Sequence, residues 1–403
     1  MKAGQQFYPA DWTDMAPRIS FAFRPFRNDR TVIRGGYGIY FNSTMNLALF
    51  RLGSNPPWAT VTNYFADKGA PPITFDNPFP VGTAGVPPPA NYGGLTPDFK
   101  VGYSQLRSLH LAHQFSENNA IEIGYAGNLA LGGDRGVNAN NAPPGPGPLQ
   151  PRRRFPLYGV LTEVRSDAKT FYNSGTAKYT RRFSKGFTAL SSFTFSRTID
   201  QAFSSVAGNP TGGAESQDYS NLSQRGLSSS HRKAVWVSSA IYDLPFRGRG
   251  WTRQAIGGWQ VATISTVQSG GAFNVAVLGG VARLNTGTAQ RANRVSDGNL
   301  SGSDRNINRW FEANAFQFAP LYAYGNSETR ALIMPGLFNI DFNVKKAFIF
   351  TEARRLEFRA EFFNVLNHTN FSAPGNTLGS PNFGVIAGSE PARVSQMSLK
   401  LVF

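Results

Sequence analysis

The strongest candidate for chemistry in this sequence is a row of charged side chains near its C-terminus. Glu357, Arg359 and Glu361 occupy every second position, and Arg355 precedes them with the same spacing. Two neighbouring carboxylates can serve as a general acid and a general base, so a catalytic pair is one interpretation. Apolar residues fill the positions between them, which predicts a strand with one charged face. Because acids and bases alternate on that face, we favour a ladder of ion pairs, and we expect no enzyme.

Other motifs that suggest a ligand or metal fit their templates poorly. Residues 35–38 (GGYG) resemble a phosphate-binding loop, but the surrounding residues alternate as in a strand and no helix follows. Residues 297–304 contain acids and amides without the spacing of a calcium loop. His110 and His113 fall on opposite faces of one predicted strand, and the chain has no cysteine. The sequence therefore predicts no cofactor, no metal site and no catalytic centre.

Composition limits the classes of protein to which the 403 residues can belong. No run of 18 apolar residues is present, which excludes a membrane-spanning helix, and 33 Phe and 42 Gly are typical of a β-protein with large loops. The net charge of +16 suggests an anionic partner. We expect no nucleic-acid partner, because the basic residues are dispersed and no binding motif accompanies them. The first residues resemble no signal peptide, so we expect a cytosolic protein or a chain whose beginning is missing.

Alternation of apolar and polar residues is the clearest structural pattern. It marks strands of about ten residues, each with one apolar and one strongly polar face. In a soluble sandwich the apolar face packs on another sheet, whereas in a membrane barrel it contacts lipid and the polar face lines a wet lumen. The predicted strands are 18–26, 31–42, 101–115, 119–129, 169–183, 187–200, 231–245, 257–269, 337–348, 354–366 and 394–403.

The connections between these strands favour the membrane barrel. Short turns alternate with long irregular stretches rich in Gly, Pro, Asn and Ser, at about 43–100, 130–168, 201–230, 270–336 and 367–393. An up-and-down barrel then has all its short turns on one side, as bacterial outer-membrane barrels do. Aromatic residues flank each short turn and predict a girdle at the membrane surface, although hairpin-end core residues would give the same pattern. They are Phe26, Phe115, Phe183, Phe187, Phe246, Trp251, Phe348 and Phe350.

The fold expected from these patterns is all-β, an antiparallel up-and-down transmembrane barrel that spans residues 1–403. Eleven strands are present, whereas single-chain bacterial barrels normally have even numbers. We therefore expect the C-terminal half of a 22-stranded barrel. The polar side chains that face its lumen include Lys178, Arg182, Glu357, Arg359 and Glu361.

Several stretches together resemble a known family. They are APRISFAFRPFRNDRTVIRGGYGIYF (16–41), YTRRFSKGFTALSSFTFSRTID (179–200), YDLPFRGRG (242–250), GGWQVATISTVQSG (257–270) and RLEFRAEFFNVLNHTNFSAP (355–374). In this order they resemble the C-terminal part of the barrel of TonB-dependent outer-membrane receptors. The resemblance is strongest to the large subgroup with a carboxypeptidase-regulatory-like N-terminal domain.

The resemblance implies roles for the two ends of the barrel. The terminal strand, with Met397, Leu399, Leu401 and Phe403 on one face, resembles the signal read by the barrel-assembly machinery. The family also implies an N-terminal plug that couples to the TonB complex, and neither the plug nor its coupling box matches any residue here. Exposed aromatic residues of the long loops are candidates to capture a ligand, or they pack the loops together: Trp58, Tyr64, Trp310 and Tyr322.

The expected function is therefore TonB-energised uptake of a bulky ligand through the outer membrane. Its substrate, a siderophore, a carbohydrate, a peptide or another compound, does not follow from the sequence. One alternative is a porin-like or adhesive outer-membrane barrel without a plug. Another is a secreted, soluble β-rich protein that binds carbohydrate. The expected partners are outer-membrane lipid, the assembly machinery and TonB through the missing plug.

Overall fold

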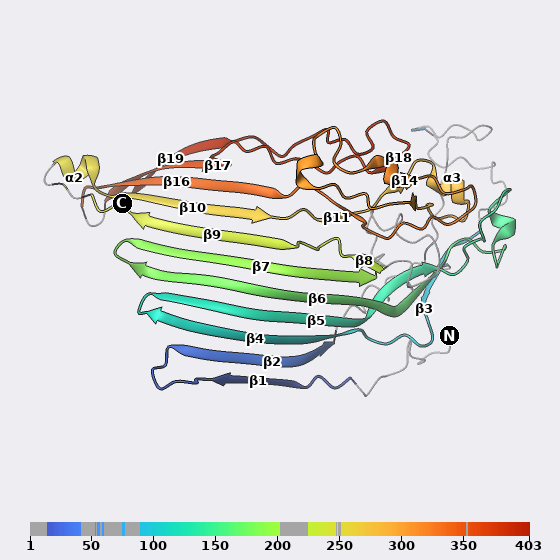
Figure 1. Cartoon of the computed structure of the whole chain (residues 1–403), viewed down its shortest axis with the longest axis horizontal. Coiled ribbons are helices and arrows are strands. Elements are labelled where there is room, and N and C mark those ends of the chain that lie inside the picture. The colour runs from blue at the N-terminus through green and yellow to red at the C-terminus, as the bar shows by residue number, and fades with distance from the viewer. Residues whose placement is uncertain are drawn as a thin grey trace.

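One large antiparallel sheet dominates the protein (Figure 1). The computed structural model describes residues 14–41, 53, 55–56, 59, 75–76, 89–201, 225–246, 248, 251–351 and 354–403. Eleven strands form the main path of the sheet and pair in chain order. They are β1 (Arg18–Phe23), β2 (Thr31–Phe41), β4 (Tyr103–Ser116), β5 (Asn119–Asn138), β6 (Leu161–Ser184), β7 (Phe187–Gln201), β9 (Ala234–Asp243), β10 (Trp259–Gln268), β16 (Leu337–Ile349), β17 (Arg355–Phe363) and β19 (Val394–Val402).

The predicted all-β, up-and-down order is thus confirmed, and all eleven predicted strands are present. Two short strands join the sheet at its sides: β3 (Tyr92–Leu95) pairs parallel with β6, and β8 (Arg225–Leu227) pairs with β7. No helix among the described residues is long and apolar enough to cross a membrane. The sheet is not a closed barrel, because β1 and β19 are its two edges and do not pair with each other (Figure 1).

The short connections lie at one end of the sheet and the long ones at the other (Figure 1). A two-residue hairpin joins β6 to β7 through Lys185 and Gly186, whose φ angles are 51° and 77°. Positive φ at both central residues is the geometry that matches the twist of a two-residue hairpin. The connection from β9 to β10 contains the helix α2 (Trp251–Ile256). We call these two ends of the sheet the turn end and the loop end.

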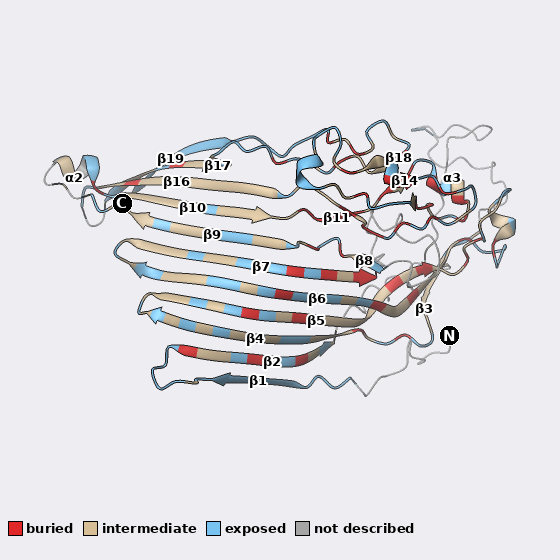
Figure 2. Cartoon of the chain, in the orientation of Figure 1, coloured by how far each residue is buried: buried red, intermediate tan, exposed pale blue. Residues whose placement is uncertain are grey.

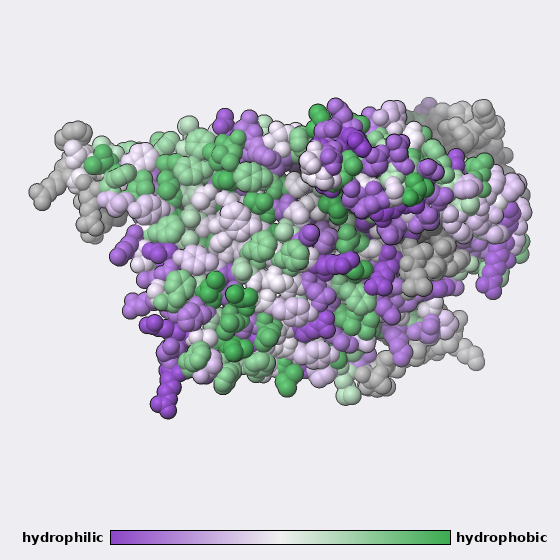
Figure 3. All heavy atoms as spheres, viewed as in Figure 1, coloured by the Kyte–Doolittle hydropathy of each residue, from purple (hydrophilic) through white to green (hydrophobic). Residues whose placement is uncertain are grey.

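The pairing register separates an apolar outer face from a polar inner face. Phe358 of β17 lies opposite Leu399 of β19 on the outer face, and Glu357 lies opposite Lys400 on the inner face. A slip of one residue would exchange the two faces. Figure 3 shows hydrophobic side chains gathered over the strands, with hydrophilic ones more frequent toward the loop end. This two-faced sheet is the arrangement expected of a barrel wall between lipid and water.

The glycines of the GGYG segment serve strand packing. A Cβ atom on Gly35 would lie 2.4 Å from Cε1 of Phe21, so the Phe21 ring occupies the space that a side chain would fill. Gly35 and Phe21 are cross-strand partners on the outer face of β2 and β1. The interpretation of this segment as tightly packed strand, rather than a phosphate loop, is therefore confirmed.

The long loops are less irregular than predicted. Residues 269–336 and 364–393 fold together into a compact unit, here called the loop cap, with a hydrophobic core. Figure 2 shows buried residues concentrated near the loop end, whereas most strand residues are intermediate or exposed. The core residues are Phe273, Val275, Val277, Ala292, Phe311, Ala315, Phe316, Leu332 and Leu378. Apolar residues without a strand or helix period form this core, which is why the sequence pattern did not predict it.

Short elements tie the loop cap together. Three two-residue ladders join distant parts of the cap, and one short helix and two 3-10 turns complete it. The cap strands pair as β11 (Ala272–Phe273) with β15 (Leu332–Ile333), β12 (Ala276–Val277) with β18 (Thr377–Leu378), and β13 (Asn293–Arg294) with β14 (Phe316–Gln317). The helical turns are α3 (Gly280–Leu284), η4 (Gly302–Asp304) and η5 (Ala313–Ala315), while η1 (Gln150–Arg152) lies in the loop after β5.

Candidate functional site

The charged row predicted on β17 lies on the inner face and forms a ladder of ion pairs. Glu357 Oε1 is 2.8 Å from Arg355 Nε and 3.4 Å from Lys345 Nζ of the neighbouring strand β16. Glu361 Oε1 is 3.6 Å from Arg359 Nη1. Lys345 lies directly opposite Arg359 in the strand register, so the carboxylates separate cations that would otherwise repel each other. We call these five residues the charged ladder.

Amide side chains extend the charged ladder toward the loop end. Asn343 Nδ2 donates to Glu361 Oε1 at 3.2 Å, and Gln396 Nε2 of β19 donates to the other carboxylate oxygen. Farther along, Asp341 Oδ1 accepts from Asn339 Nδ2 at 2.9 Å and from the Asn364 backbone N–H at 3.0 Å. A continuous polar column therefore runs along the inner face from near the turn end to the loop end.

A cavity opens where this column reaches the loop cap. Its volume is about 590 Å³, which is within the range of small-molecule sites. Strand residues line one side and cap residues the other, with two carboxylates, one guanidinium, several amides and several apolar groups. The principal lining residues are Arg232, Gln268, Met334, Asn339, Asp341, Phe363, Asn370, Phe371 and Glu390. This rim cavity can offer a ligand both hydrogen bonds and apolar contact.

A buried ion pair fastens the loop cap to the wall. Arg330 Nη2 pairs with Asp200 at the loop end of β7, and the two side chains are only 3% and 8% exposed. Arg330 Nε also donates to the Leu227 carbonyl of β8, and its backbone N–H donates to Asn274 Oδ1 at 2.6 Å. The Arg330 guanidinium therefore joins strands β7 and β8 of the sheet to the loop cap.

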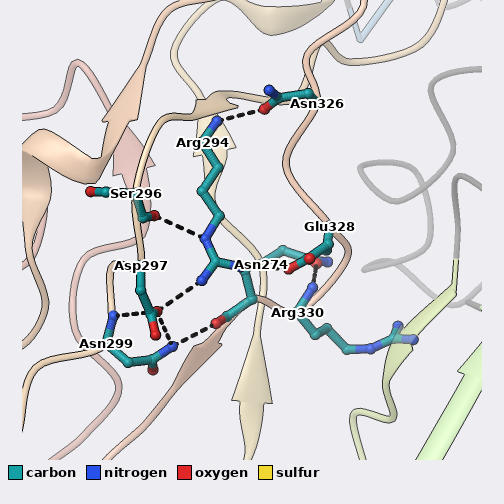
Figure 4. Close-up of polar contacts among 9 residues, drawn as sticks. Asn274, Arg294, Ser296, Asp297, Asn299, Asn326, Glu328 and Arg330 are labelled. Atoms are coloured by element: carbon teal, nitrogen blue, oxygen red, sulfur yellow. Dashed lines mark hydrogen bonds and ion pairs between the residues drawn. The ribbon is translucent and has the colours of Figure 1, made fainter.

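A second polar network orders the cap itself (Figure 4). Arg294 Nη2 lies 2.8 Å from Asp297 Oδ1, and Nη1 lies 2.5 Å from Glu328 Oε2. Asn299 donates to Asp297 from its backbone and from its side chain, both at 3.1 Å. These hydrogen bonds from Asn299, followed by the charge of Arg294, lower the pKa of the Asp297 carboxyl. The segment that loosely resembled a calcium loop is thus an ion-paired turn.

Two of the four loop aromatics proposed to capture a ligand can be placed. Trp310 packs against the cap core, and its indole Nε1–H donates to the Ile333 carbonyl at 2.8 Å. Tyr322 is an exposed cap residue with a φ of 58°. Trp58 and Tyr64 lie outside the described residues. Trp310 therefore contributes to the cap, while Tyr322 is accessible at its surface.

A second inner-face group contains Lys178, which the sequence predicted to face the lumen, together with neighbours that the sequence did not predict to lie beside it. Lys178 of β6 lies opposite Glu122 of β5, and Glu122 Oε1 is 3.5 Å from His110 Nδ1 of β4. The His110 ring lies across Gly124, where a Cβ atom would be 2.2 Å from Nδ1, and Arg34 of β2 is its partner on the other side. Alternation assigns each residue to the polar face, but only the strand register brings them together. Arg182 follows toward the turn end, where its backbone N–H donates to Asn118.

The proposed assembly signal is an exposed apolar row on the edge strand β19. Met397 lies opposite Ala360 and Leu401 opposite Leu356, so the row continues the outer face. Met397, Leu399, Leu401 and Phe403 are 71%, 66%, 59% and 91% exposed. Of the eight aromatics that flank the short turns, Phe26, Phe115, Phe183, Phe246 and Phe350 are exposed as well, while Phe187 and Phe348 are half-buried. Exposure at these positions fits a girdle and does not fit a hairpin-end core.

Comparison with known proteins agrees with this geometry. The outer membrane transporter YddB from Escherichia coli is similar at 12% identity and a TM-score of 0.51, over 96% of this chain and 40% of that chain. The pyoverdine-bound FpvA of P. aeruginosa has 9% identity and a TM-score of 0.47, over 96% and 32%. The siderophore receptor PiuA from Acinetobacter baumannii has 7% identity and a TM-score of 0.43, over 96% of this chain and 35% of that chain. The chain thus spans less than half the length of each structure.

No curated protein matches the chain. The model of the outer membrane beta barrel domain, however, matches residues 2–396, which is nearly the whole sequence. The likeness to YddB shows the same fold. Because the match covers the wall, the turns and the loop cap alike, the chain belongs to the outer membrane β-barrel domain family and is located in the bacterial outer membrane.

Proposed function

We propose that the chain is part of the barrel wall of a TonB-dependent receptor that imports a bulky ligand. The observation that carries this proposal is the polar column that connects the rim cavity with the turn end along the inner face. A ligand held between cap and wall would meet charged and amide groups continuously along its path. The ion pairs keep these groups satisfied and rigid when no ligand is present. The proposed role is transport without catalysis.

The open edges of the sheet support a larger barrel. Each edge strand has backbone N–H and C=O groups that no partner in the sheet satisfies, and in lipid each such group costs several kcal/mol. Strands β1 and β19 therefore each need a partner strand in the membrane. We infer a 22-stranded barrel that contains an N-terminal plug, in the subgroup with a carboxypeptidase-regulatory-like domain. The plug would connect the barrel to the TonB complex, and the row on β19 would be read by the assembly machinery.

A depletion experiment can test energised uptake before the ligand is known. Cells that carry the full-length gene, cells that lack it and cells that lack TonB would be grown in the same medium, with dissolved compounds followed by mass spectrometry. We expect at least one compound to be depleted only when both the gene and TonB are present. Depletion that needs the gene but not TonB would refute energised transport and would favour a plugless porin.

A conductance measurement separates the same alternatives in purified protein. The full-length protein in a planar bilayer should conduct little, because a plug would occupy the lumen. A steady open channel would contradict the plugged receptor. A protein that stays soluble without detergent and shows no heat-dependent shift on a gel would contradict the membrane barrel altogether.

A further inference from the structure

The outer face carries a group of basic residues near the loop end, where lipid contact is expected. The group consists of Arg107 on β4, Arg197 on β7, Arg225 on β8 and Lys233 just before β9, and all four are exposed. We call it the outer basic patch. Arg197 has the same parity on β7 as Phe193 and Phe195, which places it on the apolar face rather than toward the lumen.

Arg107 is held in place by its neighbours on two strands. It pairs in register with Gly127, where a Cβ atom would lie 2.6 Å from Arg107 Nε, so the side chain lies across the glycine. Arg107 Nη2 then donates to Asn173 Oδ1 at 3.3 Å, and the Tyr125 hydroxyl donates to the same oxygen at 2.6 Å. Asn173 lies opposite Arg197 in the next strand pair. One row across β4, β5, β6 and β7 therefore has a guanidinium at each end.

The other two basic groups rest on outer-face aromatic rings. Arg225 Cζ is 5.6 Å from the ring centre of Phe171, and Lys233 Nζ is 6.0 Å from that of Phe195. Such side chains extend along apolar surface and keep the charged group at the level of the polar head groups. Cation–π contact orients them without neutralising them. All four positive charges thus remain available to an anion.

Charge complementarity identifies the occupant. Within the described part of the chain, none of the four residues forms an ion pair with a carboxylate. Guanidinium groups bind phosphate oxygens well, and basic clusters at a membrane surface bind phosphorylated head groups. Arg107 and Arg197 are three strand steps apart, about 14 Å, which suits a head group with more than one phosphate. We propose that the outer basic patch binds the phosphorylated head group of an outer-leaflet lipid.

The test compares full-length variants in detergent micelles that contain a phosphorylated glycolipid or its dephosphorylated form. The triple variant Arg107→Gln, Arg197→Gln and Lys233→Gln removes three charges of the patch. A matched control, Arg27→Gln, Arg30→Gln and Lys185→Gln, removes three charges at the turn end. Bound lipid would be measured by native mass spectrometry. Each basic residue near a membrane surface contributes about a fivefold factor, so we expect about hundredfold weaker binding for the patch variant and none of this loss for the control.

Three outcomes would overturn the proposal. They are equal loss in both triple variants, equal binding of phosphorylated and dephosphorylated glycolipid, and displacement of the lipid by inorganic phosphate at a similar concentration. The single variant Arg197→Lys keeps the charge and should bind within a few-fold of wild type. If the triple variant fails the heat-shift test for folding, the pair Arg197→Lys and Arg197→Gln decides, because only the second should weaken lipid binding.

Discussion

Replacement of Asp200 by Asn should release the loop cap from the wall. The Asp200 carboxylate and the Arg330 guanidinium are almost fully buried, so the variant removes a buried negative charge that faces the guanidinium. Removal of one partner of such a pair costs about 3–5 kcal/mol, whereas the pair as a whole need not be stabilising. The cap should therefore open roughly 10²–10⁴-fold more often, while the transmembrane hydrogen bonds of the wall stay intact.

Limited proteolysis of the cap measures this opening directly. Cleavage within residues 269–336 should accelerate by the same factor when opening is fast relative to cleavage. Glu328→Gln is the matched control, because it breaks an ion pair of the same loop whose carboxylate is 63% exposed and should cost less than about 1 kcal/mol. If Asp200→Asn and Glu328→Gln are cleaved at the same rate, the buried pair does not anchor the cap. Unchanged cleavage in Asp200→Asn would refute the reasoning outright.

Three further predictions concern packing, pH and assembly. Gly35→Val should destabilise the wall by about 1–3 kcal/mol because the Phe21 ring must move, and the midpoint of the heat-induced gel shift measures this loss. Gly36→Val should not have this effect, because the atom nearest to a Cβ there is 3.5 Å away. Burial, then the nearby charges of Arg197, Arg232 and Lys233, lower the pKa of His231 below 6.5. The folded state therefore favours the neutral imidazole, and the stability that His231 contributes above pH 6.5 should be lost as the pH falls below that value. The protease sensitivity of the wild-type protein should rise over this pH range, whereas that of His231→Gln should not. Phe403→Ala should reduce the amount of folded barrel in isolated outer membranes several-fold, while the amount of newly synthesised protein stays the same. Equal amounts of folded barrel in the variant and the wild type would contradict the assembly role.

The strands were predictable because each repeats one physical demand over many residues. A wall between lipid and water needs apolar and polar residues to alternate at every position. The short connection at Lys185 and Gly186 is recognisable in the sequence as a two-residue turn. Strands β5 and β6 extend beyond the predicted ends at 129 and 169, to Asn138 and back to Leu161. The pattern fails there because the segment 130–138 is rich in glycine and the strands leave the lipid, where alternation is no longer required.

Other features depend on contacts between distant segments, which one sequence does not reveal. The cap core joins Phe273 and Phe311 of one long loop with Leu378 of another, and these residues follow no common period. Lys346 interrupts the apolar face of β16, yet it is buried at 2% exposure, donates to the Gly257 carbonyl and lies 4.9 Å from the Phe348 ring centre. At the turn end, a lysine can thus reach a polar acceptor at the membrane surface, which alternation alone would not indicate.

The rim cavity makes cap stability and ligand binding parts of one equilibrium. Its lining includes Met334 and Glu390 of the cap and Asp341 and Phe363 of the wall, so opening of the cap removes the contacts that the cap supplies to any ligand bound there. A ligand that binds only the closed form stabilises it by RT ln(1 + [L]/Kd), about 2.7 kcal/mol at a hundredfold excess over Kd. The cleavage rate of residues 269–336 is therefore also an assay for the unknown ligand. Fractions of spent medium that slow cleavage about a hundredfold contain a candidate, and Asp200→Asn should need a higher concentration of the same fraction to reach the same final cleavage rate.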